Sequence, residues 1–388
     1  MKVLHIITGL GVGGAEQQLR LMLRHLPTDS DVVALTNAGT VAQAIAADGI
    51  RVTDLGMSGN RDLAALPRLV RIIRAGRYDV VHTHLYRACL YGRIAARMAG
   101  VRAVVATEHS LGDSQMEGRP LTAGVRALYL AGERLGRVTV AVSPAVGARL
   151  HRWGVPRQRI RVVPNGIEVE RFRFDPASRA RTRQHLGLPS GAFVVGGVGR
   201  LTAGKRFDVL LRAAAQLPDD VVVVLVGSGP EEPELRRLAH RLGLDGRVRF
   251  VGESTHETSP EVSREGDAAV GAPDLPSLLS AMDALASPSP EEAFGLALVE
   301  GLASGLPVLY ASCPAVEGLD AAERSGAAYC PSDPDSFAQA LHGLRGDVPP
   351  HREAPAAVRH YCISRSADQL MNVYASVAPG PTLEVTPR

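Results

Sequence analysis

The chain has 388 residues, 45% of them hydrophobic and 21% charged, which is the composition of a globular protein with room for two domains. Its formal net charge of +3 is too small to predict a nucleic-acid partner. No apolar run approaches the roughly 18 residues that a membrane span needs, so the sequence predicts no transmembrane segment.

Strand-like and helix-like segments alternate along the chain, which predicts a parallel α/β architecture. In the first half we expect strands at residues 3–8, 32–36, 52–55, 80–83, 103–107 and 138–142. Helices are expected between them at residues 15–26, 40–48, 63–75, 90–99, 122–135 and 144–153.

A second α/β half follows VPNG and a polar, arginine-rich connection at residues 168–191. Its strands are expected at residues 193–198, 221–226, 248–251, 284–287, 308–311 and 327–330. Its helices are expected at residues 206–217, 231–242, 275–282 and 294–303, with a final helix at 364–377. The polar segment 253–272 is too long for an ordinary connection and is expected to be a flexible insertion.

The beginning of the chain, MKVLHIITGL, passes straight into glycines, so we do not expect a signal peptide. The four cysteines, Cys89, Cys313, Cys330 and Cys362, lack the spacing of metal ligands. Reduced thiols in the cytoplasm are the usual state of such scattered cysteines.

The most informative stretch is EAFGLALVEGLASG, which begins at Glu292 and contains Glu300. Glu292 is expected at the start of the helix and Glu300 about two turns further on, so their Cα atoms lie about 12 Å apart along its axis, at about 1.5 Å per residue. That span suits the two ends of one extended ligand. The N–H groups of Phe294, Gly295 and Leu296 then form an anion site at the helix start. Taken alone, the two glutamates could equally be a capping residue and a solvated one.

Three glycine-rich turns follow predicted strands. GLGVGG, which ends in Gly13 and Gly14, contains the spacing GxGxxG, but the next strand ends without the acidic residue that binds a ribose in dinucleotide sites. We therefore interpret it as a loop that approaches a phosphate or a sugar rather than as an NAD site. The turn at Gly227 suits a nucleoside, and VGRL places Arg200 after the first strand of the second half.

Lysine occurs only at Lys2 and Lys205, so 41 of the 43 basic residues are arginine. Arginine and lysine differ in size and in phosphate geometry, so a retained Lys205 either has a role that arginine fills poorly or survives by chance. Arg200 and Lys205 together can bind one diphosphate, the first as a flat fork and the second as a point charge.

Histidines end two neighbouring predicted strands: His82 and His84 end one, and Glu108-His109 follows the next. Ligands bind at the carboxyl ends of parallel strands, so these residues predict a site.

Two pairs of aspartates, Asp29 with Asp31 and Asp333 with Asp335, look like metal ligands. Both lie in turn-like contexts, and we interpret them as turn and cap residues. We predict no metal site.

The ordered set of motifs resembles the retaining, nucleotide-sugar-dependent glycosyltransferases of the GT-B fold, in family 4. The resemblance covers nearly the whole chain. Its motifs are the glycine loop with Glu16, VVHTH, TEHS, VSPAV, VPNGIE, VGRL with Lys205, LVGSGP, and SPSPEEAFGLALVEGLASGLPVL with its two glutamates.

This resemblance implies an α/β protein with two Rossmann-like parallel-sheet domains facing across a cleft. Residues 1–163 would bind the acceptor, and residues 164–358 would bind the nucleotide sugar. Residues 359–377 would form a C-terminal helix that crosses back to the N-terminal domain, and 378–388 a disordered tail.

The resemblance also implies roles for the residues singled out above. Glu300 would bind the donor ribose, and Glu292 would bind hydroxyls of the donor sugar together with the backbone of Phe294 and Gly295. Arg200, Lys205 and the Leu296 N–H would bind the diphosphate. His109 would lie against the donor sugar, and Gly13, Gly14 and Gly227 would border the ligand.

The implied activity is transfer of a hexosyl group from a nucleotide-diphosphate sugar to an acceptor hydroxyl, with retention and without a metal or other cofactor. A UDP-sugar is favoured as the donor, and a GDP-sugar is possible. An epimerase of the same fold and a noncatalytic nucleotide-sugar-binding protein are the alternatives.

The acceptor is expected to be a natural product or aminocyclitol, or else an envelope glycan or lipid. Arginines at 68, 71, 74, 119, 126 and 134 suit peripheral contact with the inner membrane face, or are simply solvated. The stretch 111–120 is expected to shape the acceptor pocket, and the insertion leaves the nucleobase open.

Overall fold

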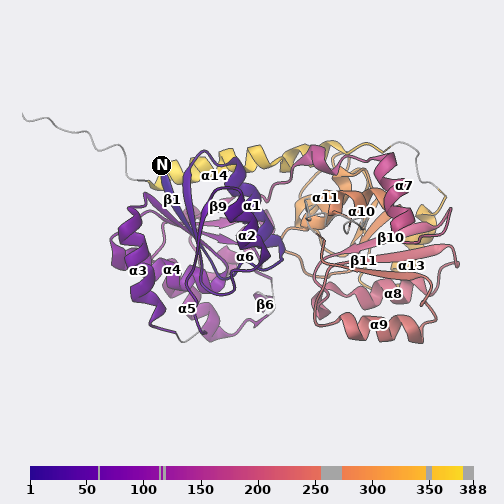
Figure 1. Ribbon diagram of the computed structural model, residues 1–388, viewed down its shortest axis with the longest axis horizontal. Helices are drawn as coiled ribbons and strands as arrows, with labels where there is room; N and C mark the ends of the chain where they lie inside the picture. The colour runs from indigo at the N-terminus through magenta and orange to yellow at the C-terminus, as the bar shows by residue number, and fades with distance from the viewer. Residues whose placement is uncertain (60–61, 113–114, 117–118, 255–272, 347–351, 379–388) are drawn as a thin grey trace, which may run out of the picture. The chain divides into compact units, whose positions relative to one another are not determined.

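A computed structural model gives the structure of the chain. It describes residues 1–59, 62–112, 115–116, 119–254, 273–346 and 352–378. The chain divides into two compact units: unit 1 is Met1–Gly166 with Ile363–Arg388, and unit 2 is Ile167–Cys362. Each unit has its own parallel sheet with helices on both faces (Figure 1). Most of the predicted insertion, residues 255–272, and the tail 379–388 lie outside the described residues.

Unit 1 is built on a seven-stranded sheet in the order β3-β2-β1-β4-β5-β8-β9, with every pair parallel. The strands are β1 (Lys2–Ile7), β2 (Asp29–Ala34), β3 (Arg51–Asp54), β4 (Val80–His84), β5 (Val104–Glu108), β8 (Val138–Ala141) and β9 (Ile160–Val162). The helices are α1 (Gly14–His25), α2 (Thr40–Ala47), α3 (Ala65–Gly76), α4 (Tyr86–Ala99), α5 (Ala123–Glu133), α6 (Pro144–Trp153) and α14 (Ile363–Val377). A short antiparallel pair, β6 (Gln115–Met116) and β7 (Arg119–Pro120), lies in the stretch expected to shape the acceptor pocket.

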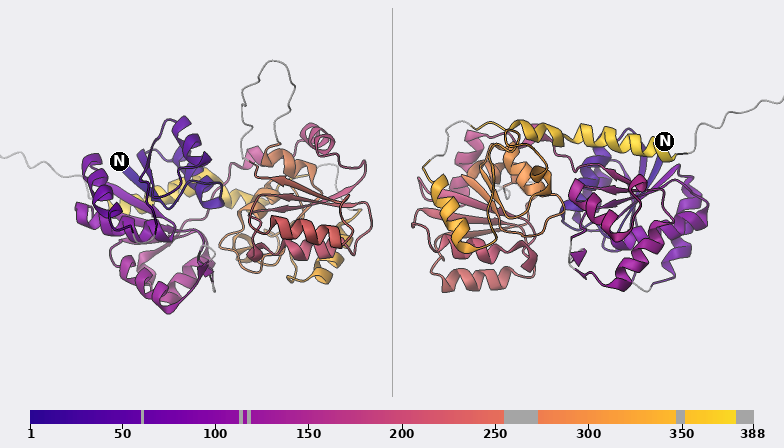
Figure 2. Two further views of the ribbon diagram at one scale, coloured as in Figure 1. Left: turned by 60° about the horizontal axis from the view of Figure 1, so that its bottom comes forward. Right: turned by 180° about the vertical axis from the view of Figure 1, so that it is seen from behind.

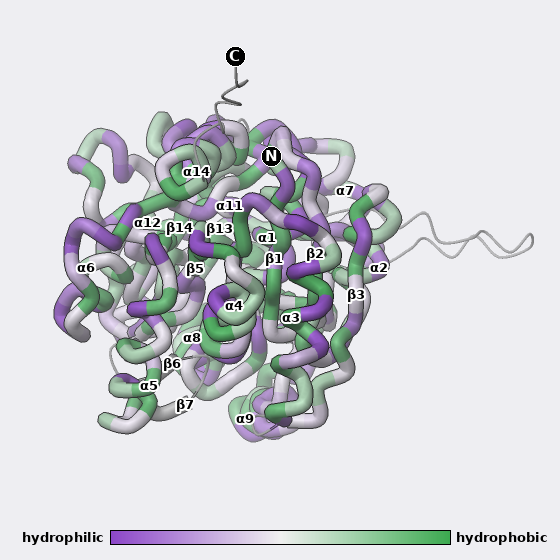
Figure 3. The backbone as a smooth tube through the Cα atoms, turned by 90° about the vertical axis from the view of Figure 1, so that its left-hand side faces the viewer, coloured by the Kyte–Doolittle hydropathy of each residue, from purple (hydrophilic) through white to green (hydrophobic). Residues whose placement is uncertain are grey.

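The central strands of unit 1 are apolar because both faces of the sheet are covered. One face carries a core under α3 and α4, and the other carries two cores under α1, α2 and α14. In α3, the buried residues Leu69, Val70 and Ile73 alternate with arginines, a pattern visible as changing hydropathy along that helix (Figure 3). This amphipathic spacing made α3 predictable.

The last helix, α14, returns to unit 1, as the resemblance implied (Figure 2). Its buried face, Ala367, Leu370, Val373 and Tyr374, packs against valines of the sheet. At its start the chain approaches Gly166 so closely that a Cβ there would lie 2.6 Å from the Ile363 Cα. The glycine of VPNG is therefore required for this close packing.

Unit 2 has a six-stranded sheet in the order β12-β11-β10-β13-β14-β15, again all parallel. The strands are β10 (Phe193–Val198), β11 (Val221–Val226), β12 (Val248–Gly252), β13 (Ala284–Ser287), β14 (Val308–Tyr310) and β15 (Ala327–Tyr329). The helices are α7 (Pro176–His185), α8 (Phe207–Ala214), α9 (Glu232–Arg241), α10 (Leu275–Ala281), α11 (Leu296–Ala303), α12 (Pro314–Glu317) and α13 (Pro334–Leu344).

The two aspartate pairs have different outcomes. Asp333 caps α13, since its Oδ1 accepts from the Ser336 N–H at 2.8 Å, which confirms the cap. The interpretation of Asp29 and Asp31 as turn residues is wrong, because both belong to β2. Asp31 is buried there and accepts a hydrogen bond from the Tyr78 hydroxyl at 2.7 Å.

Candidate functional site

Two glycine turns interlock at the carboxyl ends of β10 and β11 in unit 2. The Gly199 N–H donates to the Val226 carbonyl at 3.0 Å, and the Leu201 N–H donates to the Ser228 carbonyl at 2.8 Å. Gly227 has φ +133°, and a Cβ added there would lie 2.1 Å from the Gly199 oxygen. The backbone of one turn therefore occupies the space that a side chain would need in the other.

Replacing Gly227 by alanine should separate these turns and weaken the nucleotide site that the resemblance implies here. The strained backbone conformation alone costs about 1–3 kcal/mol, and the clash adds to it. We expect a lower urea midpoint together with a loss of UDP binding in calorimetry. Gly204→Ala is the matched control in the same region, because a Cβ there meets nothing within 4 Å. Equal behaviour of the two variants would contradict this view of the turns.

Lys205 and Glu292 form an ion pair at the same end of the sheet. The Lys205 Nζ lies 2.5 Å from Glu292 Oε1, and the two side chains are 30% and 14% exposed. Lys205 ends the short helix η3 (Ala203–Lys205), and its Nζ lies 3.8 Å from the position that a Cβ on Gly199 would occupy. The Ser289 hydroxyl donates to the Gly204 carbonyl at 3.2 Å and so connects the lysine loop to the stretch that precedes Glu292. The exposed Arg200 follows the same strand, β10.

The helix that carries Glu300 begins later than predicted. α11 starts at Leu296, with Gly295 as its N-cap at φ +94°, so the stretch from Glu292 to Gly295 is not helical. The estimate of about 12 Å along one helix axis therefore does not apply. The first N–H groups without an intrahelical partner are those of Leu296 and Ala297. Glu300 is only 3% exposed and lies within the helix rather than in solvent.

The Cys313 thiol packs against Gly295, a contact that the sequence did not predict. A Cβ on Gly295 would lie 2.6 Å from the Cys313 Sγ, and the thiol donates to the Phe294 carbonyl at 3.7 Å. Burial raises the pKa of this thiol to about 12, so it is an inert packing group. No spacing in the sequence connects Cys313 to Gly295, because the contact forms only when the β14–α12 loop packs on the start of α11.

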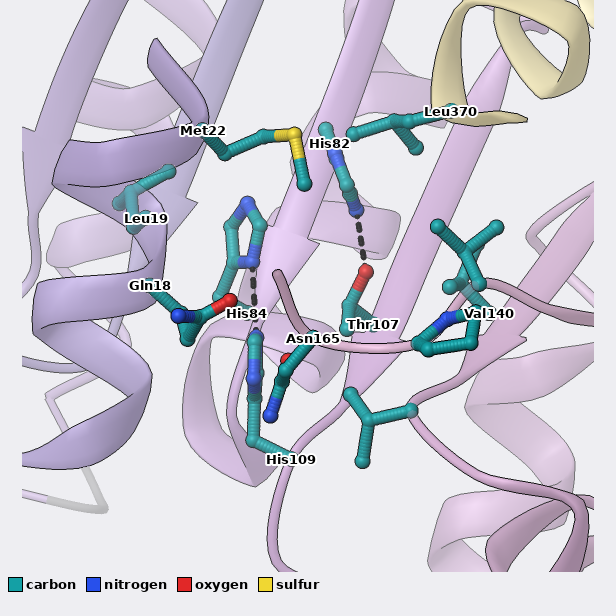
Figure 4. A pocket seen from close by; sticks show the side chains of 13 residues that line it. Gln18, Leu19, Met22, His82, His84, Thr107, His109, Val140, Asn165 and Leu370 are labelled. Atoms are coloured by element: carbon teal, nitrogen blue, oxygen red, sulfur yellow. Dashed lines mark hydrogen bonds between the residues drawn. The ribbon is translucent and has the colours of Figure 1, made fainter. Parts of the chain in front are cut away.

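Unit 1 brings together the histidines expected at a site and adds one more. His82 and His84 lie on one face of β4, and His5 on β1 is in register with His82. His84 Nδ1 lies 3.2 Å from His109 Nε2, and His84 Nε2 lies 3.1 Å from His5 Nδ1. His82 instead bonds the Thr107 hydroxyl at 2.7 Å (Figure 4). Its other nitrogen bonds the Tyr374 hydroxyl, also at 2.7 Å.

Burial lowers the pKa of every imidazole in this cluster. The pKa of His5 falls to about 3 and that of His109 to about 4, because a charged ring would lose its hydration. The pKa values of His82 and His84 are also well below the ordinary value, for the same reason and through mutual repulsion. All four rings are therefore neutral at pH 7.

Glu108 does not share the site of its neighbour His109. Its carboxylate is 1% exposed and accepts from the Tyr129 hydroxyl at 2.8 Å. The buried Arg93 guanidinium lies over the Tyr129 ring, 5.4 Å from its centroid. Because successive residues of an extended chain point to opposite sides, the pair is divided between an interior polar network and the histidine cluster.

A small cavity of about 30 Å³ adjoins the histidines within unit 1, enough for about one or two water molecules. His84, His109, Gln18 and Asn165 give it polar walls (Figure 4). Gln18 also fixes the VPNG turn, because its amide donates to the Gly166 carbonyl at 2.7 Å and accepts from the Gly166 N–H at 3.0 Å.

Gly13 and Gly14 lie at the start of α1, with Gly13 as the N-cap. A Cβ on Gly13 would lie 2.4 Å from the Glu16 carboxylate, whereas a Cβ on Gly14 would meet nothing within 4 Å. The flexible end of the Glu16 side chain could move away from a Cβ at Gly13, so packing requires a glycine at neither position.

Three histidines, His5, His82 and His84, have nitrogens within 4.8 Å of one another, a spacing that could bind a metal ion. The directions of their lone pairs do not support this. The rings of His82 and His84 lie face to face at a tilt of 38° with centroids 4.1 Å apart, and both nitrogens of His82 already bond hydroxyls. We assign hydrogen bonding, not metal binding, to this cluster.

Several surface arginines bind backbone carbonyls. Arg68 donates to the Leu55 carbonyl at 2.9 Å, and Arg74 donates to that of Met98 at 2.8 Å. Arg126 likewise donates to the carbonyl of Trp153 at 2.8 Å. These contacts favour a structural role over a lipid-binding one. Among the described residues, no helix has the length and apolarity to cross a membrane.

Two family models match the chain. The one described as Glycosyltransferase Family 4 matches residues 12–171, and the one described as Glycosyl transferases group 1 matches residues 192–347. The D-inositol 3-phosphate glycosyltransferase 1 of Catenulispora acidiphila is 31% identical over 367 residues, which cover 85% of this chain and 81% of that protein. The chain belongs to glycosyltransferase family 4.

Another relative within the family is the D-inositol 3-phosphate glycosyltransferase of Salinispora tropica, which is 33% identical over 342 residues. The match covers 80% of this chain and 66% of that protein, so the chain spans about two thirds of its length. The Mycobacterium tuberculosis (strain ATCC 25177 / H37Ra) protein of the same description is 33% identical over 276 residues, 68% of this chain and 52% of that protein.

Solved structures share the fold of this family member. Anabaena Alr3699/HepE in complex with UDP-glucose matches with a TM-score of 0.81 at 22% identity, over 97% of this chain and 100% of that one. The UDP-GlcNAc 2-epimerase from Methanocaldococcus jannaschii matches with a TM-score of 0.60 at 11% identity, over 97% and 100% of the two chains. The fold is therefore GT-B, as predicted. Fold likeness alone does not separate transferases from epimerases.

Proposed function

We propose that this protein transfers a hexosyl group from a UDP-sugar to an acceptor hydroxyl with retention of anomeric configuration and without a metal ion. The observation that carries the proposal is the meeting of Lys205, Glu292 and the interlocked turns of Gly199 and Gly227 at one end of the unit 2 sheet. The Salinispora tropica and Catenulispora acidiphila relatives, which are described as glycosyltransferases, support the same class of reaction.

The chemical demand of this reaction is stabilisation of the departing diphosphate. Lys205 and Arg200 supply fixed positive charge, and the N–H groups at the start of α11 supply dipoles. The bond between the anomeric carbon and the phosphate oxygen breaks as the bond to the acceptor oxygen forms on the same face. The acceptor proton passes to the leaving phosphate, so the step needs no carboxylate nucleophile. Glu292 and His109 would orient the sugar.

The proposal is tested by incubating the protein with UDP- and GDP-sugars and acceptors in the presence of EDTA. Proton NMR of the first product reports whether the anomeric configuration of the donor is kept. Full activity in EDTA with a retained anomer is the expected result. A strict need for added metal or an inverted product would contradict the mechanism. Incubating the donor without an acceptor identifies an epimerase, since only that enzyme would then give a new sugar isomer.

For the acceptor we propose a cyclitol or its phosphate ahead of a membrane lipid. The relatives described as D-inositol 3-phosphate glycosyltransferases support a small polyol. The surface arginines Arg68, Arg74 and Arg126 already bind backbone carbonyls, which weakens the case for a lipid surface. A panel of inositol phosphates and aminocyclitols should give turnover above that with lipid vesicles.

Replacing Glu300 by glutamine should weaken UDP binding about tenfold, which corresponds to about 1.4 kcal/mol. The amide keeps the volume of this buried side chain but loses the charge that favours hydrogen bonds from ribose hydroxyls. Calorimetric titration with UDP measures the change, and titration with uracil alone serves as the control. An unchanged affinity would remove Glu300 from the nucleotide site.

A further inference from the structure

We propose that His84 and His5 are positioning residues that hold His109 as the tautomer with its proton on Nδ1, so that His109 is a hydrogen-bond donor rather than a base. The tautomer is a property of unit 1 alone. Its use in catalysis rests on the proposed glycosyl transfer.

The three rings are joined by two direct nitrogen–nitrogen hydrogen bonds. The centroids of His84 and His109 are 5.5 Å apart with nitrogens at 3.2 Å, and those of His5 and His84 are 5.4 Å apart with nitrogens at 3.1 Å. Each centroid distance is close to the nitrogen–nitrogen distance plus two ring radii. Both hydrogen bonds therefore run nearly along the line of the centroids, where the ring N–H and the lone pair point.

Neutral imidazoles linked in this way must all donate in the same direction. Each ring has one N–H and one acceptor nitrogen, and burial lowers the pKa of all three. If His5 donates to His84, then His84 donates to His109, and His109 keeps its proton on Nδ1. If instead His109 donates to His84 and His84 donates to His5, the proton that takes part in neither hydrogen bond is on His5 Nε2.

The surroundings of the two ends decide between these directions. His5 Nε2 and His109 Nδ1 are both buried and have no hydrogen-bond partner among the described residues. His109 lines the polar cavity beside Gln18 and Asn165, whereas His5 does not line it. The neighbours of His5 on the same face of β1, Val3 and Ile7, belong to apolar cores. An orphaned N–H is costly in such a place, so the N–H belongs on His109.

This direction gives His109 a defined chemical role. Its Nδ1–H can donate to an oxygen of a bound ligand, while its Nε2 lone pair is occupied by His84. It therefore has no free basic nitrogen with which to take the acceptor proton. That agrees with transfer of the proton to the leaving phosphate.

Nitrogen-15 NMR of protein labelled in its histidines tests the proposal directly. The His109 signals are assigned by their loss in His109→Gln. In the wild type we expect His109 Nδ1 to be protonated and Nε2 to be unprotonated. In His84→Phe, which removes the donor, and in His5→Phe, which removes the bias on His84, we expect both tautomers of His109. Protonation on Nε2 in the wild type, or an unchanged single tautomer in both variants, would overturn the proposal.

Tyr374→Phe is the matched control. It removes a buried hydrogen bond to His82, whose two partners, Tyr374 and Thr107, lie outside the three-ring chain. The His109 tautomer should be unchanged in it. In turnover assays His84→Phe should lower kcat about tenfold or more with little change in the donor KM, and Tyr374→Phe should not. A protein that shows the expected tautomer but transfers no sugar would overturn the proposed function and leave this inference intact.

Discussion

Lys205→Ala should reduce kcat/KM by roughly 100- to 1000-fold, the loss found when one preorganised donor to a developing oxyanion is removed. The variant removes the positive charge beside Gly199 and the ion pair of 2.5 Å with the Glu292 carboxylate. That carboxylate would then repel the departing diphosphate. Stability should change by less than about 1 kcal/mol, because the Lys205 side chain is 30% exposed and surface ion pairs contribute little. Steady-state kinetics and urea denaturation measure the two effects separately.

Lys2→Ala is the natural control, since Lys2 and Lys205 are the only lysines in the chain. Lys2 lies 4.0 Å from Asp31 in unit 1, and its removal should leave turnover unchanged. Because the chain has only these two lysines, their chemical acetylation can be compared directly by mass spectrometry. UDP should protect Lys205, but not Lys2, from acetylation. Equal turnover of the two variants, or equal labelling with and without UDP, would exclude Lys205 from the donor site.

The strands were predictable because they are apolar and covered on both faces. The elements that the prediction missed are those that hydrophobic burial does not hold in place. The segment expected to be a polar connection contains helix α7. Its inward face holds Arg179 and Arg183, which bind the buried Asp283 at 2.7 and 2.5 Å. Hydrophobic periodicity cannot detect a helix that is anchored by charge. The edge strand β9 was missed because it is three residues long and largely exposed.

The candidate site was predictable as far as motifs place residues at strand ends. Lys205 and Glu292 were both expected in the donor site, but their direct pairing depends on how two loops pack. His5 was missed because a single histidine in an apolar strand has no distinctive spacing. Only the register of β1 against β4 puts it opposite His82 and within reach of His84.

Below pH 6.5 unit 1 should lose stability steeply. His5, His82, His84 and His109 have an ordinary pKa near 6.5 in the unfolded chain and lower values when folded, about 3 for His5 and about 4 for His109. The unfolded state therefore binds more protons between pH 6.5 and about 4, and the free energy of unfolding falls as the pH falls through that window.

Each imidazole contributes about 1.4 kcal/mol per pH unit, so His5 and His109 together lower the free energy of unfolding by about 4 kcal/mol at pH 5, and His82 and His84 lower it further. Because domains are stable by only about 5–15 kcal/mol, we expect unit 1 to unfold near this pH. The single tryptophan, Trp153, lies in unit 1 and reports on it by fluorescence.

His5→Phe should make this acid transition measurably shallower, because it removes one of the four protons that unfolding takes up. His240→Gln is the control, since His240 is an exposed residue of unit 2 whose removal should not shift the Trp153 transition. Aspartates and glutamates titrate mainly below about pH 4.5, so a transition near pH 5 separates the histidines from them. Fluorescence that stays native down to pH 4 would show that the four rings are not held neutral inside unit 1.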